Sequence, residues 1–510
     1  MTGATVRTSV LDLGSNSFHV LVADLEGRQL TPVLRQREML HLGRVVAQHG
    51  AIPDGCVAEA VDTVAHLSEL ARRSGADERL AVATAAIRDA DNGPDVLAAL
   101  SEAAGSPVRV LDGLTEARLG YLGVRAAVAI RSEPLLVLDL GGGSLELTVG
   151  IGDGVEWATS LPLGASRLSA MVTSDPIKTK QVRAITEAVD TALDPVVDEV
   201  RAHAPGTTIT VGGTVRALAR VAAQQAGVWL PATLNQLRIP TPQLAELREE
   251  LLALDLDGRT DLPAMKDRRA DHIHVAAIVL TRALERLGVA TATISDWGLR
   301  EGLLLDAHGV TTPPSASQLR HQEVERLRRT FAPDDPHLPH VAHLATQLFD
   351  GTLELHGLSG TDRELLGHAA RLHGIGEALA LRRQQEHGAY LVRNGELRGF
   401  DPAEIALLTV LIRFHPSRGI DEREPAFASL TDAQAERARR LLGLLQLADA
   451  LDRAHDQAVE RVDTHGRDGQ LQLELHGGGL HVTSAELSRR TRWFSRVFDV
   501  EVAVSDRGGT

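Results

Sequence analysis

Two Gly-rich segments of the sequence carry residue types that suit phosphate binding. One reads DLGSNS from Asp12, and the other reads DLGGGS from Asp139. Because glycine lets the backbone come close to a ligand and adopt positive φ, successive N–H groups in such a turn can converge on anionic oxygens. Aspartate repels phosphate directly, but it can hold a Mg²⁺ ion that bridges the carboxylate and the phosphate. We therefore interpret Asp12 and Asp139 as metal-binding carboxylates, and residues 14–17 and 141–144 as anion-binding turns.

These two segments belong to an internal repeat. Residues 12–27 (DLGSNSFHVLVADLEG) and 139–154 (DLGGGSLELTVGIGDG) share six identities in sixteen positions at a constant offset of 127. The identities fall on the expected strand end, the turn and the next turn, which is typical of a duplicated supersecondary unit. The alternative is a chance similarity of two plain hairpin turns, which also favour Gly and Ser. The repeat predicts two like domains that face each other across a cleft.

Two further Gly turns are expected to open helices near this cleft. VGGTVRALA, from residue 211, runs from a strand through Gly212, Gly213 and Thr214 into a helix, and a helix N-terminus attracts anions. SDWGLREGLL, from residue 295, has the same form, although Arg300 and Glu301 could equally be surface charges.

The elements that must position these motifs alternate between strand and helix in the first half of the chain, which indicates an α/β architecture. Apolar runs predict strands over 7–10, 18–25, 80–83, 108–111, 134–140, 207–211 and 291–295, with helices over 58–73 and 94–104. Beyond residue 312, prolines punctuate the chain and helical patterns dominate, over 338–349, 362–372 and 432–455. Strands over 471–475, 479–482 and 500–504 and a helix over 484–497 predict a small terminal α/β unit.

The motifs, taken in order, resemble the exopolyphosphatase / guanosine pentaphosphate phosphatase (Ppx/GppA) family. The resemblance rests on DLGSNSFHV, ATAAIRDADNG, EARLGYLGV, LDLGGGSLEL, VGGT and WGLREGLL, which are spread over residues 10–305. It implies a duplicated actin-like, ribonuclease H-like ATPase (ASKHA) fold, with a first α/β domain over 1–122 and a second over 123–312. Less sharply, it implies a helical HD-like domain over 313–456, followed by the small α/β unit over 457–510.

Two glutamates are candidates for catalysis. Glu116 follows Thr115, a good helix N-cap, so we expect it in the first turn of a helix over 116–128. Hydrolysis of a phosphoanhydride needs an oriented water, and Glu116 could serve as its base, but acidic residues in first turns also simply complement the helix dipole. Glu146 could reach back to the metal of Asp139. The first repeat has His19 at the position of Glu146, and this asymmetry argues for catalysis over packing.

The resemblance assigns roles to these residues. It implies that Glu116 is the catalytic glutamate, that Glu146 helps to position the water, and that Mg²⁺ is bound among Asp12, Asp139, Glu116 and Glu146, with a monovalent cation as a second candidate cofactor. Arg88 is implied as a phosphate clamp, because a guanidinium grips phosphate at two points; its alternative is a surface salt bridge to Asp89 or Asp91. Together the motifs and the resemblance give this phosphate-binding set: Gly14, Ser15, Asn16, Thr84, Arg88, Gly141, Gly142, Gly143, Ser144, Gly212, Gly213 and Thr214.

The helical region departs from the HD pattern of separated histidines plus a His-Asp pair. The expected pair reads His373-Gly374, and the other candidate positions are His343, His387, His415 and Asp449. Because the paired aspartate is missing, we expect no active metal phosphohydrolase site there. We interpret the histidines as packing or hydrogen-bonding residues.

The composition excludes several classes of protein. The chain has 510 residues, 53 Lys+Arg and 68 Asp+Glu, a net charge of −15, and one cysteine. A chain with only one cysteine cannot have a disulfide framework. Its net negative charge argues against a nucleic-acid binder with a broad basic surface. No apolar run is long enough to span a membrane, and no signal pattern is present, so we expect a cytoplasmic protein that contacts no membrane. The cations include only three lysines, and arginine is the better bidentate phosphate ligand.

The leading hypothesis is a Mg²⁺-dependent exopolyphosphatase that releases orthophosphate from the end of inorganic polyphosphate. Guanosine pentaphosphate 5′-phosphohydrolase would use the same residues and is the nearest alternative. A sugar-kinase-like or actin-like ATP protein shares the duplicated turns but does not supply the EAR motif at Glu116. A polyphosphate- or nucleotide-sensing module of weak activity is a further alternative. The family resemblance also implies a homodimer.

Overall fold

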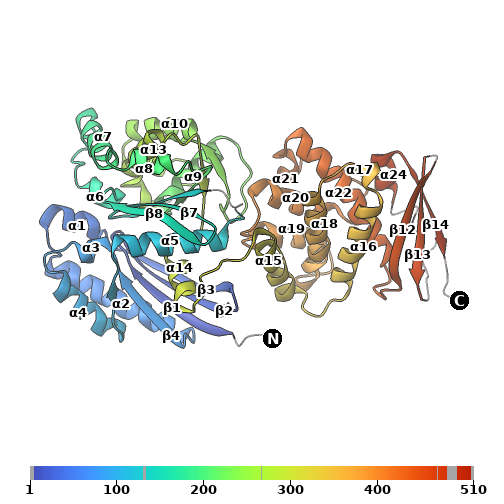
Figure 1. Cartoon of the computed structure of the whole chain (residues 1–510), viewed down its shortest axis with the longest axis horizontal. Coiled ribbons are helices and arrows are strands. Elements are labelled where there is room, and N and C mark those ends of the chain that lie inside the picture. The colour runs from blue at the N-terminus through green and yellow to red at the C-terminus, as the bar shows by residue number, and fades with distance from the viewer. Residues whose placement is uncertain are drawn as a thin grey trace. The chain divides into compact units, whose positions relative to one another are not determined.

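The protein is described by a computed structural model of residues 5–129, 134–265, 267–467, 469–478, 487 and 491–506. The chain folds into two compact units (Figure 1). Unit 1 comprises Met1–Val228 and Leu234–Leu319, and unit 2 comprises Trp229–Thr233 and Arg320–Thr510. None of the helices that the structure describes combines the length and the hydrophobicity that a membrane span requires.

Unit 1 is built on two mixed sheets. The first has the strand order β3-β2-β1-β4-β5, and the second has the order β10-β11-β9-β6-β7-β8. The strands of the first sheet are β1 (Val6–Leu13), β2 (Ser17–Glu26), β3 (Gln29–Met39), β4 (Glu78–Ala83) and β5 (Arg109–Val110). Those of the second are β6 (Leu135–Leu140), β7 (Leu145–Ile151), β8 (Gly154–Leu161), β9 (Thr207–Val211), β10 (Arg238–Pro240) and β11 (Thr291–Ile294).

The two sheets share one topology, which confirms the predicted duplication. In each, three antiparallel strands (β1-β2-β3 or β6-β7-β8) are followed by a parallel partner of the first strand (β4 or β9) and then by a strand parallel to that partner (β5 or β11). The register is equivalent as well, because Asp12 pairs with His19 across β1 and β2, and Asp139 pairs with Glu146 across β6 and β7. The second sheet carries β10 as an additional edge strand.

Helix α5 (Gly113–Ala127) lies between the two sheets of unit 1 (Figure 1). One face, with Leu119 and Leu122, packs with residues of β1 and β2, and the other, with Tyr121 and Val124, packs with residues of β6 and β9. It also packs closely on α14 (Leu299–Ala307): a Cβ at Gly123 would lie 3.0 Å from the backbone nitrogen of Gly302. The helix that carries Glu116 is therefore held by both halves of the duplication.

The remaining helices of unit 1 cover the outer faces of the sheets. Those after β3 in the first repeat are α1 (Leu42–His49), α2 (Asp54–Arg73), α3 (Ala85–Arg88) and α4 (Gly93–Ala104). Those of the second repeat are α6 (Ala165–Ser169), α7 (Thr179–Leu193), α8 (Val197–Ala202), α9 (Gly213–Gln225), α10 (Thr241–Ala253), α11 (Leu256–Thr260), α12 (Asp267–Ala270) and α13 (Ile273–Leu287).

Unit 2 is a helical core with a small three-stranded sheet. Its helices are most of α15 (Ala316–Phe331), then α16 (His337–Gly351), α17 (Leu353–His356), α18 (Gly360–Leu372), the 3₁₀ turn η1 (Ile375–Ala378), α19 (Gln384–Asn394), α20 (Pro402–Phe414), α21 (Pro425–Ala428), α22 (Asp432–Leu451) and α24 (Arg492–Phe498). The sheet has the order β12-β13-β14, formed by Val459–Arg467, Gln470–Gly477 and Glu501–Asp506. The leucine-rich faces of α16, α18, α20 and α22 form one core.

The strands and helices expected from the sequence are present, with differences at their ends. Helix α5 begins at Gly113, and Asp112 rather than Thr115 is its N-cap: the Asp112 carboxylate accepts from the Thr115 N–H over 2.7 Å. Helix α22 ends at Leu451, four residues before the expected end, because Asp452 leaves the helical conformation and binds the backbone N–H of Gln457. The expected strand 479–482 lies outside the described residues, as does most of 484–490. The expected boundary at 122/123 falls inside α5, and the division into four domains stays a prediction.

Candidate active site

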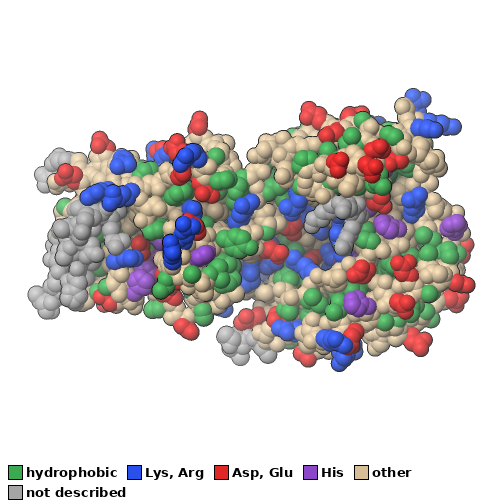
Figure 2. Space-filling model, turned by 180° about the vertical axis from the view of Figure 1, so that it is seen from behind, with side chains coloured by type: hydrophobic (Ala, Val, Ile, Leu, Met, Phe, Trp, Pro, Cys, Tyr) green, Lys and Arg blue, Asp and Glu red, His purple; other side chains and the backbone are tan. Residues whose placement is uncertain are grey.

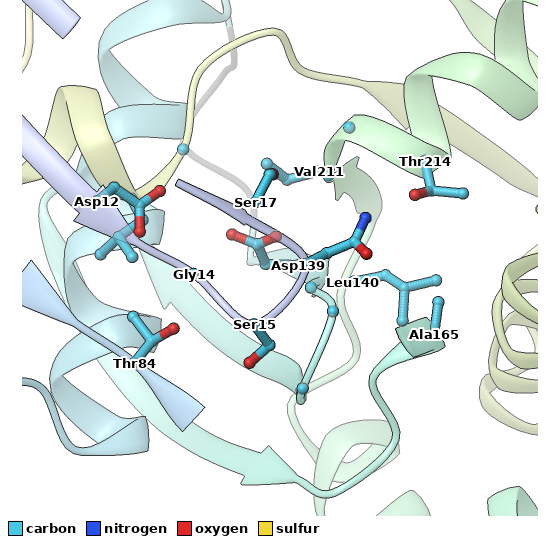
Figure 3. Close-up of a pocket in the computed structure, with 18 of the residues that line it drawn as sticks. Asp12, Gly14, Ser15, Ser17, Thr84, Asp139, Leu140, Ala165, Val211 and Thr214 are labelled. Atoms are coloured by element: carbon cyan, nitrogen blue, oxygen red, sulfur yellow. The ribbon is translucent and has the colours of Figure 1, made fainter. Parts of the chain in front are cut away.

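A pocket in unit 1 collects residues from both repeats at the ends of the equivalent strands. Figure 3 shows Asp12 and Thr84 on one side of this pocket, Thr214 and Ala165 on the other, and Asp139 between them. Every predicted site residue except Arg88 lines it: Asp12, Gly14, Ser15, Asn16, Thr84, Glu116, Asp139, Gly141, Gly142, Gly143, Ser144, Glu146, Gly212, Gly213 and Thr214. The structure therefore brings together motifs that are up to 200 residues apart in the chain.

The two Gly-rich turns lie directly against each other. A Cβ on Gly142 would lie 2.9 Å from the Cβ of Asn16 and 3.0 Å from its backbone nitrogen, so only glycine fits at this contact. The first turn is fixed from behind, because the Ser15 hydroxyl accepts from the Ala86 N–H over 3.0 Å and the Asn16 carbonyl accepts from the N–H groups of Leu40 and His41. The two anion-binding turns thus form one continuous edge of the pocket.

The third turn connects β9 to α9 and adds a helix N-terminus. Gly212 has φ 124°, a conformation that side chains rarely allow, and it turns the chain directly into α9 at Gly213. The guanidinium of Arg269 covers Gly213 and donates to the Thr214 hydroxyl over 3.0 Å. A ligand at this end of the pocket would meet both the helix N-terminus and a guanidinium.

Four carboxylates form the acidic part of the pocket. Glu116, in the first turn of α5, and Glu146, at the start of β7, are buried, with exposed fractions of 8% and 6%. Ser160 on β8 donates to Glu146 Oε1 over 2.7 Å. Helix α5 lies next to Asp139 at Gly120, where a Cβ would be in van der Waals contact with Asp139 Oδ2 at 3.6 Å. Asp12 and Asp139 are partly exposed to the pocket.

Burial and mutual repulsion raise the pKa of each of these acids. Burial is the largest cause for Glu116; Arg88 opposes it and Asp12 and Asp139 reinforce it, which leaves the pKa of Glu116 at about 7. Burial, opposed by Arg216 and reinforced by Asp12, raises the pKa of Asp139 to about 6. Burial and the neighbouring Glu116 and Asp139 raise the pKa of Glu146 well above its usual range. Burial likewise raises the pKa of Asp12. Such a cluster binds either protons or a cation.

Arg88 lies beside Glu116 and does not line the pocket. Its Nη1 donates to Glu116 Oε2 and to the Leu111 carbonyl, both over 2.9 Å, and its Nε donates to Asp89 over 3.3 Å. Asp89 also binds Arg167. The predicted role of Arg88 as a phosphate clamp stays a prediction, and the structure adds that this guanidinium holds the candidate base.

The same pocket has a cationic wall formed by Arg37, Arg216, Arg269 and Arg300. Arg300 opposes the raised pKa of Asp12, and Arg216 opposes that of Asp139, so arginines and carboxylates interact within this pocket. Burial and the other three arginines lower the pKa of Arg269 to about 9, although Asp271 opposes this shift. Burial, followed by Arg300 and Arg37, likewise lowers the pKa of His19 well below its usual range. Lys and Arg side chains are visible in the hollow between the two lobes of unit 1 (Figure 2). Crowded guanidinium groups repel one another until an anion neutralises them.

Most of this wall was not predicted from the sequence. Arg216 lies two residues after the VGGT motif and Arg300 directly after WGL, so their positions in the first turns of α9 and α14 could have indicated them. Arg37 comes from β3, and Arg269 from the short helix α12 before α13, and no local motif marks either. His272, also in the wall, sits with Nε2 within 3.5 Å of Asn16 Nδ2 and of the Thr214 hydroxyl.

The donor set of the pocket fits Mg²⁺. Among the described residues, no three of the four carboxylates bring ligand oxygens within 4.8 Å of one another, so they do not form an all-protein cage. Mg²⁺ is usually held by one or two carboxylates, with waters and substrate phosphates completing its six ligands. Asp12 and Asp139, at the ends of equivalent strands and accessible from the pocket, are the carboxylates placed to do this.

Comparisons with known proteins agree with this site. The sequence model of the Ppx/GppA phosphatase family matches residues 21–309, and that of Ppx/GppA phosphatase domain III matches residues 319–487. The chain is 33% identical to Exopolyphosphatase 1 of Mycobacterium leprae over 63% of this chain and 97% of that protein. It is 34% identical to Exopolyphosphatase 1 of Mycobacterium tuberculosis H37Rv, over 59% of this chain and 88% of that protein.

Solved structures show the same fold in unit 1. An exopolyphosphatase from Cytophaga hutchinsonii matches with a TM-score of 0.56 and 25% identity, over 60% of this chain and all of that chain. The Aquifex aeolicus member of the Ppx/GppA family matches with a TM-score of 0.50 and 25% identity, over 60% of this chain and 98% of that chain. The mixed α/β fold of this chain is therefore of the actin-like Ppx/GppA type.

Proposed function

The chain belongs to the Ppx/GppA phosphatase family and is a phosphoanhydride hydrolase, and from this premise we propose that it is a Mg²⁺-dependent exopolyphosphatase that releases orthophosphate from the end of inorganic polyphosphate. The observation that carries the proposal is that one pocket holds both the four carboxylates and the four arginines, beside three Gly-rich turns. A polyanion that arrives with a divalent cation suits both sets of charges, because the cation neutralises the carboxylates and the phosphates neutralise the guanidinium groups.

Glu116 is the group that takes the proton from the attacking water. Its pKa of about 7 places a substantial fraction in the carboxylate form at neutral pH, while the protonated form is still accessible after the transfer. Arg88 occupies Oε2, so Oε1 is the atom that accepts the proton. The water oxygen then bonds to the terminal phosphorus, the bridging P–O bond breaks, and the shortened chain leaves with the bond's electron pair.

The terminal phosphates are bound by the turns and the cationic wall. Residues 14–16 and 142–144 line the pocket, where their backbone N–H groups would bind phosphate oxygens. The N-terminus of α9, with Thr214 and Arg269, lines it as well. Asp12 and Asp139 would hold Mg²⁺, which would supply positive charge to offset the negative charge of the phosphates that opposes attack. Glu146, hydrogen-bonded to Ser160, is placed to orient the water.

The test is a comparison of substrates. We expect the purified protein to release orthophosphate from long-chain polyphosphate with a kcat/KM at least about tenfold above that for guanosine pentaphosphate or ATP, and only with Mg²⁺ present. A preference for guanosine pentaphosphate would replace the proposal with guanosine pentaphosphate 5′-phosphohydrolase. Transfer of phosphate from ATP to a sugar hydroxyl would replace it with a kinase. The homodimer expected from the family stays a prediction.

A further inference from the structure

A second cluster of metal-ligating side chains lies in the core of unit 2, outside the active site. It consists of His337, the first residue of α16, His373, which follows α18, and Asp449, in the last turn of α22. Their side chains are 4%, 3% and 9% exposed. The Nε2 atoms of the two histidines are 3.2 Å apart, and Asp449 Oδ1 lies 3.4 Å from that of His337 and 3.5 Å from that of His373.

The surroundings of the two histidines determine where their protons are. His373 Nδ1 lies 2.7 Å from the carbonyl of Ala370, and His337 Nδ1 lies 2.8 Å from a carboxylate oxygen of Asp452. Both partners can only accept, so each Nδ1 carries a hydrogen and each neutral ring presents a lone pair at Nε2. Two lone pairs and a carboxylate oxygen then point at one another. Either a metal ion at the centre or a second proton on one of the rings relieves this arrangement.

The same hydrogen bonds are the ones that metal-bound histidines make. A ligating imidazole usually donates its other N–H to a carboxylate or a backbone carbonyl, which fixes the ring orientation and raises the basicity of the ligating nitrogen. His337 uses a carboxylate and His373 uses a carbonyl. His415 beside them follows the pattern: its Nδ1 lies 2.8 Å from the Ile412 carbonyl, and its ring centroid is 5.0 Å from that of His373.

The spacing of the three atoms matches one coordination geometry. A tetrahedral Zn²⁺ ion with ligand bonds of about 2.0–2.1 Å separates its ligand atoms by about 3.3–3.4 Å. The three measured separations are 3.2, 3.4 and 3.5 Å. An octahedral ion with bonds of similar length would bring neighbouring ligands to about 2.9–3.0 Å. Two imidazoles and one carboxylate are also a donor set that suits zinc better than magnesium.

We propose that His337, His373 and Asp449 bind a tetrahedral divalent zinc-type ion that stabilises unit 2. The ion joins the start of α16 to the ends of α18 and α22, three elements that contribute to one apolar core. The position after His373 is Gly374, where a Cβ would lie 2.8 Å from Leu338 Cδ2, so this side of the site is closed by an apolar side chain. With three protein ligands, the fourth tetrahedral position would be taken by a water molecule or another small ligand. Under this proposal His373 would bind the ion, whereas the sequence predicts a packing or hydrogen-bonding role for it.

The competing occupant of the cluster is a proton. Burial opposes the charging of His337, but hydrogen bonds to Asp449 and Asp452 outweigh it and raise the pKa of His337 to about 9. A second proton, on Nε2 of His337, would also remove the repulsion between the lone pairs of His337 and His373. The two occupants differ in their response to metal, because only a metal site loses stability on chelation and regains it on addition of the ion.

The experiment uses the full-length protein. After dialysis against metal-free buffer, we expect roughly one zinc ion per chain by mass spectrometry of the metal content. A strong chelator should lower the midpoint of thermal unfolding, and Zn²⁺, but not Mg²⁺, should restore it. His373→Gln and Asp449→Asn should lose the ion. His343→Gln is the matched control: it removes an exposed histidine of the same helix α16 and should retain it.

Two results with zinc would overturn the proposal, and a check with cobalt gives a third. One is a wild-type protein that holds no metal and whose unfolding midpoint does not respond to Zn²⁺, which would assign the cluster to a proton. The other is equal loss of metal in His343→Gln and His373→Gln, which would place the ion elsewhere. Because the variants could fail to fold, Co²⁺ is added to the chelated wild-type protein as an independent check. Tetrahedral Co²⁺ gives intense visible absorption, whereas an octahedral surface ion gives weak absorption and contradicts the proposal.

Discussion

The Arg88 guanidinium donates to the Glu116 carboxylate over 2.9 Å, and this bond offsets part of the burial that raises the pKa of Glu116. Without the arginine, the candidate base would stay protonated to a higher pH. With a stronger ion pair to Arg88, the pKa of Glu116 would be lower, and its carboxylate would be too weak a base to take a proton from water. The pair therefore sets the pH at which the pocket can act, and it does so from a position outside the pocket lining.

Replacement of the Glu116 carboxylate tests the base directly. We expect Glu116→Gln to lower kcat for polyphosphate by at least ~100-fold, the usual contribution of a general base, with the affinity for substrate retained. Steady-state phosphate release and equilibrium binding of polyphosphate measure the two effects. Glu102→Gln, on the exposed surface of α4, is the control and should behave as wild type. Unchanged turnover in Glu116→Gln would remove this residue from the mechanism.

Removal of the Arg88 guanidinium should shift the pH dependence of the reaction. In Arg88→Met the pKa of Glu116 rises, so the acidic limb of the kcat/KM profile should move to higher pH. A shift of one unit from a pKa of about 7 lowers the carboxylate fraction at pH 7, and with it the activity, by about fivefold, with recovery towards pH 9. Arg118→Met, which loses only an exposed pair with Asp306, is the control. If Arg88 instead clamps phosphate, KM will rise and the acidic limb will stay where it is.

The cationic wall predicts a binding defect that depends on salt. Arg269→Met removes a guanidinium that is repelled by three neighbouring arginines. The substitution therefore relieves repulsion in the free protein, and it weakens the complex with a polyanion because one cation is lost. We expect KM for polyphosphate to rise by about tenfold or more, as loss of a charge-assisted hydrogen bond would give, with a smaller change in kcat. The dependence of KM on ionic strength should become weaker. Arg238→Met, exposed on β10, is the matched control. A fall in kcat with unchanged KM would contradict this assignment.

The carboxylate cluster predicts how Mg²⁺ and pH act on stability. Acids whose pKa is raised in the folded protein hold protons there longer than in the unfolded chain, so their contribution is favourable at low pH and is lost as pH rises. For Asp139, with a pKa of about 6, and Glu116, with about 7, the loss falls between about pH 4 and pH 7. Mg²⁺ should therefore raise the unfolding midpoint more at pH 8 than at pH 5.

Asp139→Asn separates this effect from the rest of the protein. The variant removes one of the repelling charges, so at pH 8 without Mg²⁺ it should unfold at a higher temperature than wild type, and it should gain less from added Mg²⁺. At pH 5 the difference between the two proteins should shrink. Thermal unfolding of both proteins, with and without Mg²⁺, is followed by circular dichroism at pH 5 and pH 8. This gives the effect of Mg²⁺ on each protein at each pH. An Mg²⁺ response that is equal at both pH values would contradict the carboxylate cluster as its source.

Local sequence patterns were sufficient for the parts of the site that are continuous in the chain. Asp12 and Asp139 with their glycines were predictable because each motif ends a strand and recurs at one offset, and the equivalent pairings Asp12–His19 and Asp139–Glu146 confirm that register. The residues that were missed reach their sites through tertiary structure. Arg37 and Arg269 come from a strand and a short helix without a motif, and His337 meets His373 only because α16 packs on α18.

The N-cap of α5 was predicted at the wrong residue from the local sequence pattern. Thr115 and Asp112 both have the side chain of an N-cap, and only the conformation of the chain at Asp112, with φ −78° and ψ 161°, decides between them. The border between the units, near residue 319, was indicated by prolines and by the change to helical patterns. Sequence alone could not show that α5 crosses the expected domain boundary, because its two apolar faces serve two different cores.

Glu116 and Glu301, two acids in the first turns of helices that border the same pocket, differ in whether they cap their helix. In α14, Glu301 accepts from the N–H of Gly298 and so serves as the helix's own capping group. In α5, Asp112 performs that task from the exposed side of the turn, over 2.7 Å to the Thr115 N–H. Glu116 is therefore not needed as the capping group of its own helix. The duplicated scaffold therefore uses Glu301 to cap its own helix and leaves Glu116 available for the catalytic role that we propose for it.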